Sequence, residues 1–356
     1  MKILQVCLTY HSHIGGISEH VKNIAEKLAR NFDVTVCATD PLGGLPKEEE
    51  IDGVKVKRFK SWAPNNSYFF SRQLRKYLAE NSGNYDIVDA HSYHDLPAFY
   101  AAQAKNRNKL VFTPHYHGVG HTFFRNLLHV PYELFSKKIF EKADKIVCVS
   151  NYEKKLIIDH FKIEGKKAIV IPNGVNLEEF KGLGKTKKDY KAILYVGRLE
   201  KYKGVEYLVR VLPKLDKDKT LEVVGKGAHK KSLVKLAKNM GVESRVRFYQ
   251  DLSRGELLKK FKDADVFVSL SEYEAFGISI AEAIASKTPC IVANKSALKE
   301  WIDGKNCFGI GYPIDLEELA SLIGSVIGKR AGTSKLLDWN EVTKRIVNLY
   351  RALLDV

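Results

Sequence analysis

The sequence has few cysteines and no long apolar run, and both absences exclude whole classes of protein. It contains five cysteines in 356 residues and no Cys-x-x-Cys pair. Cys7, Cys37, Cys148 and Cys290 lie in apolar, strand-like segments. We therefore expect small core residues in a reducing compartment, and no disulfide or zinc framework.

No apolar run approaches the roughly 18 residues that a membrane span needs. The N-terminal MKILQVCLTY is expected to be the first strand of a globular domain, because a Gly-Gly loop and a helix follow it directly.

The chain also lacks a basic tail or a dense Lys/Arg block, although its formal net charge is +16. The excess of positive charge is spread over both halves of the sequence. Such a surface attracts anions in general, including phosphate-bearing ligands, anionic lipid surfaces and nucleic acid. No recognisable nucleic-acid-binding module accompanies the charge, so we expect no nucleic-acid partner.

Short β-branched segments alternate with helical patterns along the chain, without solenoid-length repeats or low-complexity segments. This alternation predicts parallel sheets with helices on both faces. It stops at a polar stretch near 176–190, which we interpret as a linker, and then restarts. We therefore expect an α/β protein with two doubly wound, Rossmann-like domains facing across a cleft, over 1–172 and 173–339. The last segment, 340–356, has the apolar stripe of an amphipathic helix.

Segment 271–283, SEYEAFGISIAEA, lies between a buried strand and a predicted helix, where open α/β sheets bind ligands. The N-terminus of a helix attracts anions, and Gly277 lets a ligand approach the backbone closely. Glu274 and Glu282 could flank this ligand, because vicinal sugar hydroxyls donate paired hydrogen bonds to a carboxylate. The alternative is an acidic first turn that only stabilises the helix dipole.

Basic and glycine residues follow other predicted strands. Arg198 and Lys203, in YVGRLEKYKGVEYL, suit a diphosphate, because a guanidinium fork and an ammonium both bind phosphate oxygens. The alternative is two solvated basic side chains. Gly15 and Gly16 between the first strand and a helix permit close approach to phosphate, although they do not form a complete Gly-x-Gly-x-x-Gly motif.

Histidines and aspartates offer candidate ligands for a metal ion, but we expect no metal site. His115 could contact a substrate hydroxyl or be a structural loop histidine. His117 and His121 have metal-ligand spacing but no convincing carboxylate or cysteine partner. The pairs Asp216–Asp218 and Asp263–Asp265 precede strands, so they should lie at the edge of the sheet opposite the ligand edge.

Together these motifs resemble retaining nucleotide-sugar glycosyltransferases of the family-four type, which have a two-domain B-type fold. SEYEAFGISIAEAIASKTPCIV is similar to the family's signature of two glutamates eight residues apart around a Phe-Gly pair. Five other segments are similar to its landmarks, in order: GGISEHV, VSNYEKKL, IPNGVNLEEF, YVGRLEKYKG and VVGKG. Two places depart from the pattern. Lys287 replaces a usual glycine, and ANKSALKEWI lacks a glycine pair.

The resemblance covers essentially the whole chain and implies transfer of a sugar from a nucleoside-diphosphate sugar to an acceptor, with retention of configuration. It implies neither a cofactor nor a metal ion. Glu282 would hold the ribose hydroxyls, and Glu274 would meet hydroxyls of the transferred sugar. Three backbone N–H groups would lie near the phosphate or the sugar: those of Phe276, Gly277 and Ile278.

The remaining roles implied by the resemblance concern the leaving group and the reacting sugar. Arg198 and Lys203 would neutralise the diphosphate. Gly16 would approach it from the N-terminal domain, and Gly225 would border the base. His115 matches the position near the reacting sugar. The final helix would cross back to the N-terminal domain.

Two other classes of function stay open at this point. One is a non-catalytic nucleotide-sugar-binding protein, and the other is an epimerase or phosphorylase on the same fold. The acceptor is expected on the N-terminal domain, where segments 68–77 and 121–138 mix aromatic residues with Arg and Lys. These are interfacial helices for a lipid-linked acceptor, or ordinary helices packed on the sheet. We expect a cytoplasmic protein that is peripheral to the inner membrane face in the first case.

Overall fold

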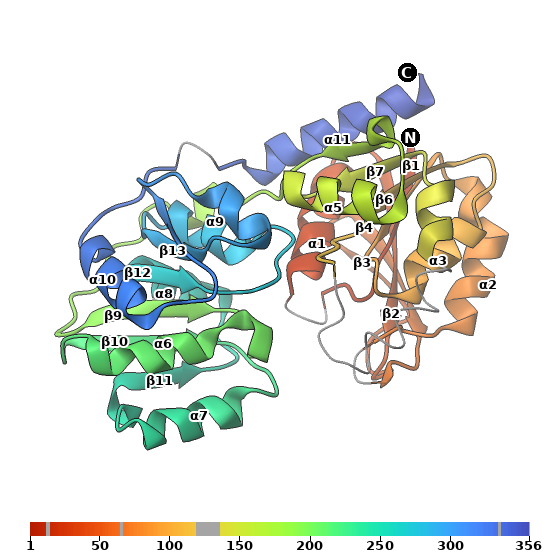
Figure 1. The fold of residues 1–356 in the computed structure, drawn as a ribbon. Helices are drawn as coiled ribbons and strands as arrows, with labels where there is room; N and C mark the ends of the chain where they lie inside the picture. Colours follow the sequence, from red (N-terminus) through yellow and green to blue (C-terminus); the bar gives the residue numbers. More distant parts are fainter. Residues whose placement is uncertain (12–14, 65–66, 119–135, 334–335, 356) are drawn as a thin grey trace. The chain divides into compact units, whose positions relative to one another are not determined.

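The chain forms two compact units, each built around its own sheet (Figure 1). The computed structural model describes residues 1–11, 15–64, 67–118, 136–333 and 336–355. Unit 1 comprises Met1–Gly174 and Leu337–Val356, and unit 2 comprises Val175–Leu336. The predicted fold class, with two parallel-sheet α/β domains, is confirmed.

Unit 1 contains, among the residues described, a sheet of eight strands in the order β3-β4-β2-β1-β5-β6-β7-β8. The strands are β1 (Lys2–Val6), β2 (Asp33–Asp40), β3 (Glu48–Ile51), β4 (Val54–Lys60), β5 (Ile87–His91), β6 (Lys109–Thr113), β7 (Lys145–Cys148) and β8 (Ala168–Val170). Neighbouring strands are parallel except β3 and β4. The sequence EEEI of β3 gave no strand signal, because it lacks apolar alternation. Ion pairs such as Lys57–Glu48, at 2.7 Å, attach it to β4.

Helices cover both faces of this sheet, so two apolar cores flank it. They are α1 (Gly16–Ala29), α2 (Arg72–Asn81), α3 (Leu96–Gln103), α5 (Asn151–Phe161) and α11 (Trp339–Leu354), and residues 136–142 are also helical. The helical pattern in the sequence extends back to Tyr68, but α2 begins only at Arg72. The side chain of Ser71 caps it, accepting a hydrogen bond from the Leu74 N–H, and Tyr68 is instead bridged to Asp95.

The C-terminal helix α11 packs in the core of unit 1 beside α1 (Figure 1). Its apolar stripe, including Val342 and Ile346, is buried. Tyr350 is fully buried, and its hydroxyl donates a 2.5 Å hydrogen bond to Oδ2 of Asp89, at the centre of the sheet. Burial raises the pKa of Asp89 to about 7, although the hydrogen bond from Tyr350 opposes this rise. The last helix is therefore held by a buried polar contact as well as by apolar packing.

Unit 2 has a sheet of six parallel strands, counted over the part of the chain that is described, in the order β11-β10-β9-β12-β13-β14. The strands are β9 (Lys191–Val196), β10 (Lys219–Val224), β11 (Val246–Tyr249), β12 (Val266–Ser269), β13 (Cys290–Ala293) and β14 (Cys307–Ile310). The helices are α6 (Val205–Val211), α7 (Lys230–Asn239), α8 (Arg254–Asp263), α9 (Ile278–Ala285) and α10 (Leu316–Val326). The polar stretch near 176–190 lies on this unit, with Phe180 in its core and Lys185 paired with Asp265.

Two expectations drawn from absences in the sequence can be compared with the structure. The five cysteines are all buried and form no disulfide, and the four that the sequence placed in apolar strands are core residues as expected. Among the residues that the structure covers, no helix combines the length and the apolar character needed to cross a membrane.

Replacing Tyr350 with phenylalanine should destabilise unit 1. The Tyr350→Phe variant removes the hydrogen bond that the Tyr350 hydroxyl donates to the buried Asp89, so we expect the free energy of unfolding to fall by about 1–3 kcal/mol. Because the hydrogen bond favours the ionised carboxylate, the loss should be larger above pH 7, where Asp89 ionises, than at pH 5. Denaturant unfolding at both pH values measures this. The exposed Arg351→Ala variant is the control, and equal losses in both variants would contradict the role of the buried contact.

Candidate active site

The loops at the carboxyl edge of the unit 2 sheet bring most of the predicted residues together. Arg198 follows β9, and Lys203 ends a short 3₁₀ turn, Lys201–Lys203. Nζ of Lys203 donates a 2.5 Å hydrogen bond to Oε1 of Glu274, which follows β12. Arg198 donates to the hydroxyl of Tyr202 at 2.7 Å, and the Tyr202 carbonyl accepts from the N–H of Glu272. The two motifs of the sequence are therefore joined directly.

The N-terminus of α9 carries no side-chain cap and no acidic first turn among the described residues. Gly277 is the N-cap residue with φ 95°, and no side chain of the described residues caps the helix. The first turn contains no acidic residue, so the alternative of an acidic turn that stabilises the dipole is wrong. Glu282 lies in the second turn, and Glu274 lies in the preceding loop. No carboxylate in the first turn of α9 therefore neutralises the partial positive charge at the N-terminus of this helix.

The loop before α9 is held by backbone contacts that the sequence did not predict. The indole N–H of Trp301 donates a 2.7 Å hydrogen bond to the carbonyl of Phe276, and the two rings pack edge to face. Oγ of Ser296 accepts from the N–H of Glu274 at 3.2 Å. The N–H groups of Gly277 and Ile278 follow directly on this fixed segment. A ligand at the helix end would therefore meet a preorganised backbone.

Arg254 is a functional candidate that the sequence reasoning missed. It is the first residue of α8, and its Nη1 donates a 2.5 Å hydrogen bond to Oε1 of Glu282. Its Nη2 reaches Oε2 of Glu179 at 2.6 Å. Partial burial lowers the pKa of Arg254, but the two carboxylates outweigh burial and raise it. The only sequence signal here, the capping box of Ser253 and Glu256, predicts a helix start and not a contact 28 residues away.

Two glycines allow the loops of the site to pack closely. Gly225 follows β10 with φ 148°, and a Cβ there would lie 1.9 Å from the carbonyl oxygen of Gly197. Gly204 has φ 70°, and a Cβ there would lie 2.5 Å from the carbonyl oxygen of Leu270. A side chain at either position would push the loops apart.

The two departures from the family pattern keep a glycine-like backbone. Lys287 has φ 64° and Ser296 has φ 50°, which are left-handed conformations that glycine adopts most easily. Lys295 stands beside Ser296, and its Nζ pairs with Glu272 at 2.8 Å and lies 4.1 Å from the centre of the Tyr312 ring. This chain therefore has a cation–aromatic cluster next to Glu274.

Gly16 and His115, the other two predicted site residues, belong to unit 1. Gly16 is the first residue of α1, whose N-cap residue Gly15 is extended and offers no capping side chain. His115 follows β6 with φ 51°, and its ring packs edge to face on that of His20, with centroids 4.9 Å apart. Burial, together with the neighbouring histidines, lowers the pKa of His115 well below its ordinary value. It is therefore neutral at pH 7. His121 lies outside the described residues.

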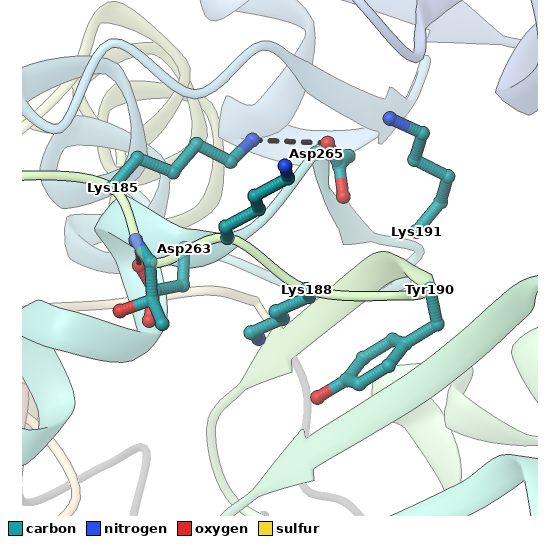
Figure 2. Close-up of a pocket in the computed structure, with 8 residues that line it drawn as sticks. Lys185, Lys188, Tyr190, Lys191, Asp263 and Asp265 are labelled. Atoms are coloured by element: carbon teal, nitrogen blue, oxygen red, sulfur yellow. Dashed lines mark hydrogen bonds and ion pairs between the residues drawn. The ribbon is translucent and has the colours of Figure 1, made fainter.

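The aspartate pairs lie at the opposite edge of the unit 2 sheet, as the sequence predicts. A pocket of about 350 Å³ lies there, and Figure 2 shows residues that line it, among them Asp263, Asp265 and Lys191, the first residue of β9. Asp265 accepts from the N–H of Ala192 at 2.8 Å and pairs with Lys185 at 2.9 Å. The carboxylate of Asp265 thus links the start of β9 and the segment around Lys185 at the amino edge of the sheet. The pair is not placed to hold a metal ion on a ligand at the carboxyl edge.

Family models match both parts of the chain. The model described as Glycosyltransferase Family 4 matches residues 14–179, and the model described as Glycosyl transferases group 1 matches residues 177–337. An uncharacterised glycosyltransferase of Methanocaldococcus jannaschii is 28% identical over 100% of this chain and 99% of its own.

Solved structures support the same fold. Sucrose-phosphate synthase from Thermosynechococcus elongatus has a TM-score of 0.83 at 21% identity, covering 100% of both chains. The Anabaena protein HepE in complex with UDP-glucose has a TM-score of 0.79 at 19% identity, covering 99% of this chain and 100% of that one. With family models over 14–337 and the same fold in both neighbours, the protein belongs to the glycosyltransferases of the family-four type with the B-type fold.

Proposed function

We propose that this glycosyltransferase moves a sugar from a nucleoside-diphosphate donor to an acceptor, with retention of configuration and without a metal ion. The observation that carries the proposal is the N-terminus of α9, which no described side chain caps, with Glu274 in the loop before it and Glu282 in the second turn. Each glutamate is already paired with a basic residue, Glu274 with Lys203 and Glu282 with Arg254. Such a site offers positive charge to a diphosphate and carboxylates to hydroxyl groups.

Donor binding would exchange the partners inside this site. Lys203 and Glu274 neutralise each other when no ligand lies between them. A diphosphate would draw Lys203 to its oxygens, which leaves Glu274 free to accept hydrogen bonds from the sugar hydroxyls. Arg198, held by Tyr202, adds a second cation for the diphosphate. The positive charge should matter most as the glycosidic bond breaks, because negative charge then grows on the leaving phosphate.

The ribose end of the donor would be held by Glu282. Arg254 would keep this carboxylate in place, because its guanidinium pairs with Oε1 of Glu282 at 2.5 Å. Glu179 takes another hydrogen bond from the same guanidinium and so fixes its orientation. Arg254 is thus a positioning residue for Glu282.

The proposed mechanism needs no nucleophile from the protein. The acceptor attacks on the face from which the diphosphate departs, and the leaving phosphate takes the acceptor's proton. The family resemblance assigns His115 to the reacting sugar and Gly16 to the diphosphate. As a neutral imidazole, His115 can exchange hydrogen bonds with a hydroxyl without adding charge next to an oxocarbenium-like centre.

The acceptor is proposed to bind unit 1 and to be lipid-linked. In that unit Trp62 is 68% exposed and Phe70 is 41% exposed, next to Arg72 and Arg75 of α2. Exposed aromatic and basic side chains together suit the surface of an anionic membrane, and we propose a cytoplasmic protein that attaches there.

A mass-spectrometric screen of nucleotide sugars against lipid-linked, oligosaccharide and small-molecule acceptors tests this proposal. Product with soluble acceptors alone would remove the membrane proposal.

The same screen separates transfer from the two alternative functions. A binding protein gives no product with any acceptor. An epimerase changes the donor without an acceptor, and a phosphorylase consumes phosphate. Formation of a new glycoside that depends on the acceptor supports the proposal.

Replacing Arg198 with alanine should reduce turnover by at least about tenfold, because a charge-assisted contact that strengthens in the transition state is lost. Steady-state kinetics with saturating donor measures this. Arg210→Ala, an exposed arginine at the end of α6, is the matched control. Equal turnover in wild type and a folded Arg198→Ala variant would contradict the leaving-group role.

The two glutamates should separate in calorimetry with UDP, GDP and ADP. Glu282→Gln should weaken binding of the preferred diphosphate by about 10–100-fold, because the ribose is common to donor and product. Glu274→Gln should spare the bare diphosphate and weaken only the intact nucleotide sugar. Equal effects of both substitutions on the bare diphosphate would overturn this division.

Transfer should persist in excess EDTA. Arg198, Lys203 and the end of α9 already supply positive charge to the diphosphate, so a divalent ion is not required there. Asp216→Asn should leave the rate unchanged, because Asp216 is 83% exposed at the amino edge and pairs only with the neighbouring Lys219 within the described residues. Loss of activity with EDTA that magnesium or manganese restores would refute metal independence.

A further inference from the structure

Three histidines from separate elements of unit 1 meet in a buried cluster. His20 lies on α1, His91 ends β5, and His115 follows β6. His20 and His91 are almost fully buried, and His115 is partly exposed. One nitrogen from each ring lies within 4.8 Å of the other two. The ring centroids are 4.9–6.2 Å apart.

Most of the nitrogens in this cluster have no partner. Nδ1 of His20 is 2.7 Å from Oδ1 of Asn173, but its Nε2 is buried without a hydrogen bond. Both nitrogens of His91 and Nε2 of His115 are also buried without a hydrogen bond. The nearest acidic atom to His91 is Oδ1 of Asp89, 3.7 Å away, which is too far for a hydrogen bond. Unsatisfied buried nitrogens are costly, so several at one point indicate a missing ligand.

The arrangement has the chemistry of a transition-metal site. Burial keeps His20 and His91 neutral, so each has a lone pair to offer. The amide oxygen of Asn173 can only accept a hydrogen bond, so it fixes the proton of His20 on Nδ1 and leaves Nε2 for a metal ion. Three imidazole ligands favour Zn²⁺ or Co²⁺ over Mg²⁺ or Ca²⁺, which prefer oxygen ligands, and the carboxylate of Asp89 lies beside the cluster, 3.7 Å from His91.

We propose that His20, His91 and His115 bind a zinc-class transition-metal ion. Bond lengths of about 2.0–2.1 Å place tetrahedral ligand nitrogens roughly 3.4 Å apart, so nitrogens that now lie within 4.8 Å of one another must approach by up to about 1.4 Å. His115 can supply that movement, because it lies on a loop and is the least buried of the three. Water or a ligand oxygen completes the fourth position.

A second group of potential ligands, His11, Glu26 and Asp52, does not have this character. Its residues are more exposed. Nε2 of His11 is already paired with Oε1 of Glu26 at 3.1 Å. This group leaves no buried nitrogen without a partner, and it therefore serves as the control for binding of metal ions at the surface.

The ion should inhibit transfer. This consequence, unlike binding itself, rests on the proposed function, which assigns His115 to the reacting sugar. A divalent cation next to an oxocarbenium-like transition state repels the positive charge that develops there. It also takes a lone pair of His115. The sequence-based expectation of no metal site considered His117, His121 and the two aspartate pairs, because residues 20, 91 and 115 have no spacing that predicts their contact.

The test is a Co²⁺ titration of the full chain, freed of metal ions with EDTA and carrying no polyhistidine tag. We expect an intense visible absorption band typical of four-coordinate Co²⁺, with an endpoint at one equivalent. His115→Ala, at the partly exposed position, and His91→Ala should lose the band, and His11→Ala should keep it. Zn²⁺ should raise the melting temperature of the wild type and not that of His115→Ala.

The possible results separate the metal site from the proposed function. No band in the wild type, or an equal band in a folded His115→Ala variant, would overturn the site. A band with unchanged transfer in saturating Zn²⁺ would overturn the inhibition. A band in a protein that transfers no sugar with any donor would support the site and refute the proposed function instead.

Discussion

Parallel strand order is the constraint on which the rest of the molecule depends. Parallel strands end at one edge, and each loop to the following helix begins there. In unit 2 this brings Arg198, Lys203, Glu274 and Glu282 to one side, although more than 80 residues separate the first from the last. In unit 1 the same rule places His91 and His115 after neighbouring strands. The direction of the strands thus determines which side chains can meet at one edge of the sheet.

Three glutamates at the ligand edge of unit 2 are paired with basic side chains. Lys203 pairs with Glu274, Arg254 with Glu282, and Lys295 with Glu272. The strongly basic chain therefore uses its glutamates as local counterions at the ligand edge. Because these pairs are partly exposed, breaking one of them to admit a ligand costs little, and the pair members can change partners without large movement of the backbone.

The sequence predicted what periodicity and contiguous motifs can encode. The alternation of strands and helices predicted the fold class, and the helix predicted in segment 271–283 is found as α9, directly after Phe276 and Gly277. Strand β3 was missed, because its acidic sequence is stabilised by ion pairs and not by apolar alternation. Arg254 and the His20–His91–His115 cluster were missed for a different reason. Their contacts join residues far apart in the chain, and no local spacing encodes them.

The position of α11 has a consequence for how the protein is made. Unit 2 is one continuous segment, whereas unit 1 needs helix α11, which is translated only after the whole of unit 2. Unit 2 can fold while translation continues. The core face around Ile24 stays uncovered until Trp339, Val342 and Ile346 arrive. For that interval the nascent chain exposes an apolar surface that a chaperone can bind, and a chain truncated before residue 337 would keep it exposed permanently.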